Sequence, residues 1–219
     1  MRTLDPRLKK HIDLLISRYP ALGEVKQDII NAYLVMEECY EHDGKLLIAG
    51  NGGSAADAEH IAGELMKRFK TPRPVTPEFA DKLKSIDPFR GDNLAKNLER
   101  SLMAIPLVAH EALTTAYIND VDGLGVFAQQ LFGFGRPGDV FLGISTSGNS
   151  KNVLSATVVA RAVGIKVIGL TGTDGGELAK VADVCVRVPS DETYMIQELH
   201  LPIYHCWCLM LEDKFFGKE

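Results

Sequence analysis

The stretch "DVFLGISTSGNSKNVLSATVVARAVGIKVIGLTG", residues 139–172, contains two apolar runs separated by a helical pattern. The first run ends in hydroxyl groups, one glycine and two asparagines, and the second run follows the helical pattern directly. A strand, a helix and a second strand in this order form a unit whose two strands lie parallel. This stretch therefore predicts an α/β fold.

The same alternation extends to both sides of this stretch. Three further short apolar runs are "KLLIAG" (45–50), "AIPLVAH" (104–110) and "VCVRVP" (184–189). Strands that are continuously apolar and separated by helices are buried on both faces. We therefore expect a parallel sheet covered by helices on both sides, with ligands bound beyond the carboxyl ends of the strands.

The remaining segments predict helices before the sheet and one insertion within it. Residues 1–43 carry helical patterns at about 6–18 and 24–42, separated by "YPALGE". The second pattern has an apolar stripe typical of a core or subunit contact. The charged, proline-punctuated segment at about 70–100 predicts an insertion with helical pieces rather than a linker. We expect a single domain over 1–219.

Composition excludes several classes of protein. The formal net charge is -5, and no basic stripe of the kind that binds nucleic acid is present. The chain has no apolar run of about 20 residues, and its first residues lack the features of a signal peptide. We expect a cytoplasmic protein with no membrane or nucleic-acid partner. The cysteines fit a reducing compartment as core thiols; they are Cys39, Cys185, Cys206 and Cys208.

The hydroxyl groups after the third apolar run predict a phosphate site. Ser145, Thr146, Ser147 and Ser150 lie between a strand end and a helix start, where backbone N–H groups are unpaired. These donors and the helix dipole favour an anion without a lysine. The alternative is a serine-rich helix N-cap with no ligand. The concentration of four hydroxyls favours a phosphate monoester on a small molecule.

A glycine-rich loop, "GNGGSAADAEH" (50–60), follows the first apolar run. Ser54 and Asp57 have the spacing of a capping box at a helix start. The loop matches neither the P-loop nor the dinucleotide fingerprint, so no nucleotide cofactor is indicated.

Polar residues on two predicted helices are candidates for a catalytic site. Asp57, His60 and Glu64 share one helix face, although a solvated face with a Glu64–Arg68 pair is the alternative. Gln197 and His205 share a broad face of an otherwise apolar C-terminal helix. A lone histidine there is more often a core residue, so His205 gains significance only together with Glu64.

Four motifs in order resemble the sugar isomerase (SIS) domain family, specifically its phosphoheptose isomerase branch. They are "GNGGSAADAEH", "GISTSGNSKNVL", "LTGTDGG" and "IQELHLPIYH", and the similarity covers nearly the whole chain apart from 70–100. The resemblance implies a three-layer, flavodoxin-like sandwich with a five-stranded parallel sheet. It also implies a homotetramer with active sites at subunit interfaces. The implied reaction converts sedoheptulose 7-phosphate to a heptose 7-phosphate aldose, D-glycero-D-manno-heptose 7-phosphate.

The resemblance also implies roles for individual residues. Glu64 matches the catalytic base and His205 the catalytic acid. The positions that match substrate-binding residues are Asn51, Gly52, Gly53, Ser54, Asp120, Ser145, Thr146, Ser147, Ser150 and Gln197. Some members hold zinc between positions that match His60, Glu64, Gln197 and His205. Such nitrogen and oxygen donors suit zinc but also nickel or manganese, and an acid–base pair without metal is the alternative.

Aldose–ketose isomerisation independently requires these residue types. A proton moves between adjacent carbons through an enediol, which needs a base at carbon and a proton donor at oxygen. A carboxylate and an imidazole can do both. One alternative is an isomerase of another sugar phosphate. Another is a non-catalytic SIS protein that binds a replication initiator or senses sugar phosphates. The presence of both Glu64 and His205 favours an enzyme, because the initiator-binding relative lacks both groups.

Overall fold

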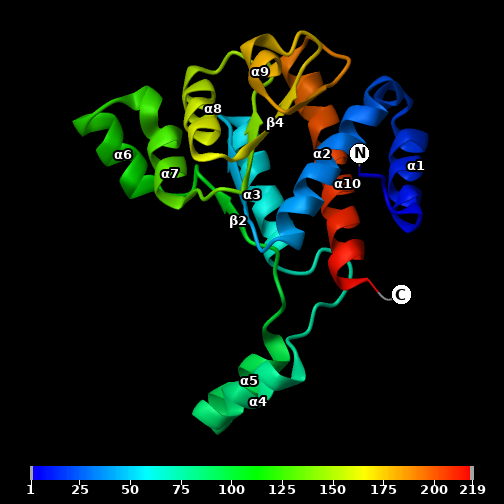
Figure 1. Cartoon of the computed structure of the whole chain (residues 1–219), viewed down its shortest axis with the longest axis vertical. Helices are drawn as coiled ribbons and strands as arrows, with labels where there is room; N and C mark the ends of the chain where they lie inside the picture. Colours follow the sequence, from blue (N-terminus) through cyan, green and yellow to red (C-terminus); the bar gives the residue numbers. More distant parts are fainter. Residues whose placement is uncertain (1, 218–219) are drawn as a thin grey trace.

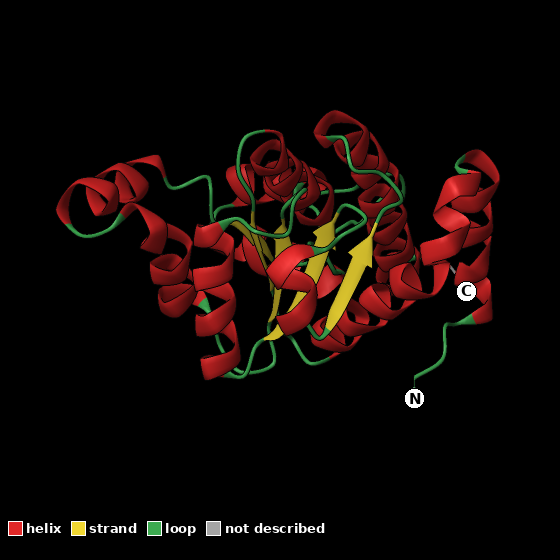
Figure 2. Ribbon diagram, turned by 90° about the horizontal axis from the view of Figure 1, so that it is seen from above, coloured by secondary structure: helices red, strands yellow, loops and turns green. Residues whose placement is uncertain are grey.

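A computed structural model describes residues 2–217 and shows a five-stranded sheet at the centre of the molecule (Figures 1 and 2). The strands are β1 (Leu46–Ala49), β2 (Ala104–Pro106), β3 (Val140–Ile144), β4 (Lys166–Thr171) and β5 (Val184–Arg187). Their order is β2-β1-β3-β4-β5, and every neighbouring pair is parallel. The prediction of a parallel α/β sheet is therefore confirmed.

Both faces of the sheet are buried, as the continuous apolar runs predict. In β1, Leu46 and Ile48 belong to one hydrophobic core, whereas Leu47 and Ala49 belong to the other. Successive side chains of a strand point to opposite faces, so one apolar run supplies both cores.

Helices form the two outer layers, and Figure 2 shows the strands enclosed by helices. The first core is covered by α1 (Lys9–Arg18), α2 (Lys26–Glu41), α3 (Gly53–Met66) and α10 (Thr193–Phe216). The second is covered by α7 (Val126–Phe134), α8 (Lys151–Val163) and α9 (Gly176–Val181). This is the expected three-layer sandwich, and α1 and α2 confirm the predicted N-terminal helices.

Within the described residues 2–217, three short 3-10 helices and one outlying helix complete the body. The 3-10 helices are η1 (Pro6–Leu8), η2 (Pro20–Val25) and η3 (Gly123–Gly125). Helix α6 (Glu111–Asp120) lies at the edge of the body and buries none of its side chains (Figure 1). No helix within residues 2–217 is both long and apolar enough to cross a membrane.

The predicted insertion forms a two-helix arm that extends away from the body (Figure 1). The arm consists of α4 (Pro77–Ile86) and α5 (Pro88–Asn97). Asp87 ends α4 and caps α5 by accepting hydrogen bonds from the N–H groups of Phe89 and Arg90. Within the arm only Gly91 is buried. The arm therefore has almost no core of its own in a single chain.

The four cysteines carry free thiols. Cys39, Cys206 and Cys208 are buried and Cys185 is half-buried. Burial raises the pKa of the Cys39 and Cys206 thiols to about 12. These groups are unreactive thiols of the interior, as expected.

The strand order locates the ligand-binding edge. In a sheet of order 2-1-3-4-5, the connections leave β1 and β3 toward opposite faces, which opens a crevice at the carboxyl ends of these two strands. Here the helix after β1, α3, covers one core and the helix after β3, α8, covers the other. The glycine-rich loop and the hydroxyl loop are the segments that follow β1 and β3.

Candidate active site

The hydroxyl loop (residues 145–150) is held tightly against the loop after β4. Gly148 has φ +67°, and a Cβ there would lie 2.0 Å from the carbonyl oxygen of Gly175. Only glycine fits this position. At the two ends of the loop, the Ser145 and Ser150 hydroxyls are 2.9 Å apart. The loop is therefore fixed before any ligand binds.

This loop presents unpaired donors. Five N–H groups donate no hydrogen bond to any other residue within 2–217: those of Thr146, Ser147 and Ser150 in the loop, and those of Lys151 and Asn152 in the first turn of α8. The side chain of Ser150, the N-cap of α8, makes no capping hydrogen bond. The alternative of a helix cap without a ligand is therefore disfavoured, and the arrangement suits a phosphate at a helix N-terminus.

The structure contradicts the capping box predicted in the glycine-rich loop. Helix α3 begins at Gly53, its N-cap is Gly52 with φ +56°, and no side chain caps it. Ser54 is buried inside the first turn, and Asp57 instead accepts a hydrogen bond from Tyr204. The prediction was wrong because a glycine with positive φ turns the chain into the helix two residues earlier than the Ser54 N-cap required.

The two loops meet through a pair of amide side chains. Asn51 Nδ2 donates to Asn152 Oδ1 at 3.0 Å, and Asn152 Nδ2 donates to Asn51 Oδ1 at 2.8 Å. Asn51 therefore lies at the N-terminus of α8, beside the hydroxyl loop. Gln197 lies over the start of α3, where a Cβ on Gly53 would be 2.6 Å from its Nε2 atom. The structure brings these predicted binding residues to one edge of the sheet.

A second polar cluster lies farther along α3 and α10. His60 Nε2 is 3.4 Å from Glu64 Oε1 and 3.4 Å from His205 Nε2. Lys67 Nζ contacts the other Glu64 oxygen at 3.2 Å. The alternative Glu64–Arg68 pair is absent from the contacts of the described chain, because Arg68 pairs with Glu99. The predicted catalytic pair is thus assembled around His60 from two helices.

The surroundings of His205 favour its neutral form. Burial lowers the pKa of His205, and the neighbouring His60 lowers it further, while Glu64 opposes them. A neutral imidazole can accept a proton or bind a metal ion.

Tyr204 is a site residue that the sequence interpretation missed. Its buried hydroxyl donates to Asp57 Oδ1 at 3.0 Å and lies 3.1 Å from His60 Nδ1. Burial raises the pKa of Asp57, and the hydrogen bond from Tyr204 partly opposes this. The apolar helix around Tyr204 gave no signal, because only packing shows that its hydroxyl meets α3.

Two predicted residues lie apart from the catalytic cluster in this chain. Gln197 precedes His205 by eight residues, about 12 Å along an α-helix. Asp120 is exposed at the end of α6, where it accepts a hydrogen bond from Asn119. From Gly53 to Glu64 is likewise about 16 Å of helix. The glycine-rich loop, which contacts the start of α8 through Asn51, is therefore well separated from the predicted catalytic pair of the same chain.

The donor set around His60 can be tested for metal binding. Two ligands at about 2.0–2.1 Å from a tetrahedral zinc lie roughly 3.4 Å apart. Both His60 distances, 3.4 Å to Glu64 and 3.4 Å to His205, agree with that spacing. Within residues 2–217, however, no three His, Cys, Asp or Glu side chains already converge as a metal site. The pairwise distances fit zinc, and small rotations of these side chains would bring them to one point.

A buried ion pair joins the helices that carry this cluster. The Arg73 guanidinium donates to Glu212 Oε1 on α10, to the Leu65 carbonyl at 2.8 Å and to the Glu64 carbonyl at 3.2 Å. Glu212 also accepts the backbone N–H groups of residues 69–71. The pair therefore ties the last turn of α3 to α10, close to Glu64.

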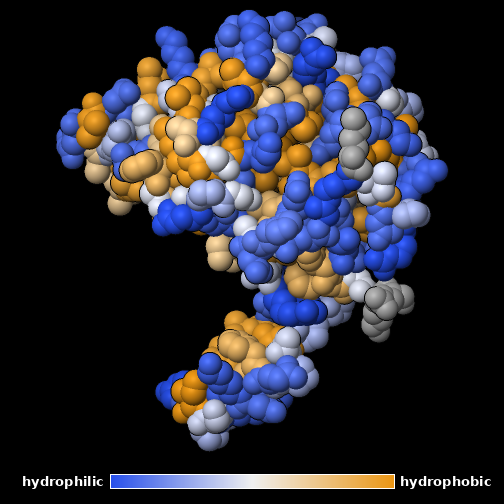
Figure 3. All heavy atoms as spheres, in the orientation of Figure 1, coloured by the Kyte–Doolittle hydropathy of each residue, from blue (hydrophilic) through white to orange (hydrophobic). Residues whose placement is uncertain are grey.

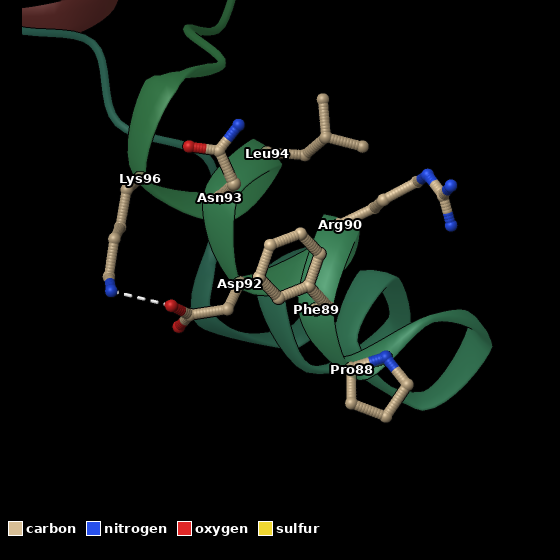
Figure 4. A pocket seen from close by; sticks show the side chains of 7 residues that line it. All are labelled: Pro88, Phe89, Arg90, Asp92, Asn93, Leu94 and Lys96. Atoms are coloured by element: carbon tan, nitrogen blue, oxygen red, sulfur yellow. Dashed lines mark hydrogen bonds and ion pairs between the residues drawn. The ribbon is translucent and has the colours of Figure 1, made fainter.

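A hollow of about 850 Å³ lies elsewhere, against the arm (Figure 4). All its lining residues, from Pro88 to Lys96, belong to α5, and Phe89 and Leu94 contribute its apolar part. A hollow lined by a single helix is an open surface, and it shares no residue with either polar cluster.

Comparison with known proteins gives a consistent result. The model of the SIS domain matches residues 21–101 and 93–172. The chain is 43% identical over 178 residues to the phosphoheptose isomerase of Sulfurimonas denitrificans, which covers 81% of this chain and 78% of that protein. The chain is also 37% identical over 212 residues to the phosphoheptose isomerase of Coxiella burnetii, and the match covers 95% of this chain and 94% of that protein.

Solved structures agree with these relatives. The phosphoheptose isomerase of Neisseria gonorrhoeae is 33% identical, covers 96% of this chain and 100% of its own, and superposes with a TM-score of 0.72. The phosphoheptose isomerase of Francisella tularensis is 31% identical, and the match covers 95% of this chain and 100% of that one. It also superposes with a TM-score of 0.72.

Proposed function

Since the chain belongs to the SIS domain family and, within it, to the phosphoheptose isomerases, we propose that its site converts sedoheptulose 7-phosphate to D-glycero-D-manno-heptose 7-phosphate. One observation carries this proposal at the level of residues. A row of unpaired N–H donors lies at the β1/β3 crevice, and the helices α3 and α10, both in the layer over the first core, carry a carboxylate and two imidazoles in mutual contact.

The hydroxyl loop holds the phosphate in this mechanism. Its N–H groups, the hydroxyls of Ser147 and Ser150 and the dipole of α8 point toward one anion. Asn51 and Gln197 border this position. Binding energy at the phosphate then orients the reacting carbons, which lowers the barrier without any chemistry at the loop.

Glu64 and His205 move the protons. Glu64 removes the proton from the carbon next to the carbonyl and returns it to the adjacent carbon, so that an enediol forms and collapses. His205, with its lowered pKa, moves the proton between the two oxygens. The pair Arg73–Glu212 holds the backbone of Glu64 against α10 during these steps.

Zinc is part of the proposal. His60, Glu64, Gln197 and His205 would hold it, and it would supply a Lewis acid that polarises the sugar oxygens. Support comes from the spacing of the His60 pairs, although Gln197 must reach toward them from two turns away.

Metal analysis tests this part. Protein purified without a histidine tag should contain about one zinc per chain, and a chelator should lower activity reversibly. Full activity in rigorously metal-free protein would leave Glu64 and His205 as an acid–base pair without metal.

A homotetramer is also proposed, with active sites shared between subunits. Apolar side chains are exposed on the arm and around α6, including Phe89 at 86% and Val121 at 67% (Figure 3). The long separation of phosphate loop and catalytic pair in one chain also favours a shared site, to which Asp120 of another subunit can contribute.

Sedimentation tests the assembly. Wild-type protein should sediment as four chains, because contact between copies covers these apolar surfaces. An active, stable monomer would contradict shared sites.

Two narrower points complete the proposal. The free thiols support a cytoplasmic location. Isomerisation of another sugar phosphate is the second candidate.

The deciding experiment is an assay with a panel of ketose phosphates that includes sedoheptulose 7-phosphate. We expect the corresponding heptose 7-phosphate aldose. Conversion of a different ketose phosphate alone would establish the second candidate, and no conversion of any would remove the isomerase proposal.

The phosphate loop makes a separate prediction. Replacing Ser147 and Ser150 together by alanine should raise KM by at least about a hundredfold, since each of the two hydrogen bonds to a charged group contributes about 1.5–3 kcal/mol. The change in kcat should be smaller. The control is the double replacement of Ser17 and Ser85 by alanine. These two serines lie on α1 and α4, outside both loops of the candidate site. An unchanged affinity for substrate and inorganic phosphate would place the phosphate elsewhere.

A further inference from the structure

The contact between Asp57, Tyr204 and His60 has no role in the proposed proton transfers. Asp57 and His60 lie one turn apart on α3, and the Tyr204 hydroxyl from α10 reaches both. The Tyr204 side chain is 1% exposed, and its ring meets the His60 ring edge-on at 5.5 Å. The buried Tyr204 side chain therefore packs beneath the His60 ring, whose side chain is 42% exposed.

The position of one proton decides what His60 can do. A phenol hydroxyl has one proton to donate, and a carboxylate can only accept. The other Asp57 oxygen is buried and has no partner among residues 2–217. Tyr204 is thus the only side-chain donor that the structure gives to Asp57, so the phenol proton lies toward Asp57.

The phenol oxygen is then left to accept from His60. The Nδ1 atom of His60, 3.1 Å from the phenol oxygen, is placed to donate this hydrogen bond. A neutral imidazole has only one N–H, so the lone pair is at Nε2. That atom is the one that lies 3.4 Å from Glu64 Oε1 and 3.4 Å from His205 Nε2.

We propose that Tyr204, backed by Asp57, is a positioning residue that fixes His60 in the Nδ1–H tautomer and turns its Nε2 lone pair toward Glu64 and His205. The tautomer itself follows from the three contacts alone. Its consequence for zinc rests on the proposed function, because only there does His60 Nε2 become a ligand. A hydrogen-bonded outer partner of this kind fixes the orientation of metal-binding histidines and typically changes metal affinity by 10–100-fold.

The test uses Tyr204→Phe, which keeps the ring and removes only the hydroxyl. Full-length protein with ¹⁵N-labelled histidine is studied metal-free at about pH 8, where an ordinary imidazole is neutral. The ¹⁵N chemical shifts of the His60 ring are identified as the signals that are missing from His60→Gln. In the wild type they should show a hydrogen on Nδ1. Tyr204→Phe should give a mixture of tautomers. Asp57→Ala should shift His60 toward Nε2–H, because the freed hydroxyl can then donate to Nδ1.

Tyr33→Phe is the matched control. Tyr33 is also buried, and its hydroxyl donates to the Glu37 carboxylate at 3.1 Å on α2, away from the cluster. The Tyr33→Phe variant should lose about as much stability as Tyr204→Phe and leave the His60 signals unchanged. Zinc titration should give about 10–100-fold weaker binding in Tyr204→Phe and wild-type binding in the control.

The outcomes separate the two proposals. A wild-type His60 protonated at Nε2, or His60 signals that Tyr204→Phe leaves unchanged, would overturn the inference whether or not the protein binds zinc. If the tautomer changes as expected but the wild type neither binds zinc nor isomerises sugar phosphates, the inference about His60 stands and the proposed function fails.

Discussion

Replacing Glu64 by glutamine or His205 by alanine should each lower kcat by at least about a hundredfold, because loss of a positioned general acid or base typically costs 10²–10⁴ in rate. Glutamine keeps the size of Glu64 but cannot take the carbon-bound proton. Alanine at 205 removes the imidazole from a position that is partly exposed, so folding should be retained. Turnover of sedoheptulose 7-phosphate at saturation is the measurement, with circular dichroism as a check of the fold.

Two exposed residues provide controls for these variants. Glu59→Gln changes a carboxylate on the same helix, α3, that is exposed to solvent, and His42→Ala removes an exposed imidazole after α2. Both should retain nearly full activity. If both Glu64→Gln and His205→Ala also turn over at close to the wild-type rate, the assignment of the catalytic pair is wrong.

Replacing Arg73 by methionine should lower the free energy of unfolding by about 3–5 kcal/mol, the usual consequence of removing one partner of a buried ion pair. Arg73 is 0% exposed and Glu212 is 1% exposed, so the remaining carboxylate stays buried without its cation. Urea denaturation measures the loss. Arg90→Met is the control, because Arg90 pairs with Asp87 on the exposed arm, where such pairs contribute about 0–1 kcal/mol.

The same ion pair makes stability depend on pH. Burial alone would raise the pKa of Glu212, but hydrogen bonds from the backbone of residues 69–71 and the charge of Arg73 outweigh it and lower the pKa. A group with a lowered pKa stabilises the folded state above its unfolded pKa and loses this contribution as the pH falls through the folded pKa. The wild-type protein should therefore lose stability below the ordinary glutamate value of 4.5.

The pH dependence should be weaker in Glu212→Gln than in the wild type, since that side chain no longer titrates. Equal slopes of unfolding free energy against pH in the two proteins would show that Glu212 contributes nothing to acid sensitivity. Likewise, a loss in Arg73→Met no larger than in Arg90→Met would show that the buried pair does not hold α3 to α10.

The sequence by itself determined the parallel sheet, its two helical layers and the position of the hydroxyl loop at the end of β3. Each of these features depends on a short stretch of sequence. A run such as "DVFLGI" is largely apolar because both faces of its strand are buried. Hydroxyls between a strand end and a helix start lie next to unpaired N–H groups, independently of the rest of the fold. The four motifs that resemble SIS proteins extended this to Glu64 and His205, which could not have been chosen from helical spacing alone.

Tertiary structure alone decided which polar groups meet. The start of α3 at Gly53 rather than after Ser54 depends on a backbone turn at Gly52 and on the close approach of Gln197. Tyr204 and Glu212 stand in an apolar helical sequence and acquire their roles only from Asp57, His60 and Arg73, whose positions are 147, 144 and 139 residues away along the chain. Spacing within one helix fixes which side chains share a face, but the partner of a buried polar group is set by packing between helices, which no local pattern encodes.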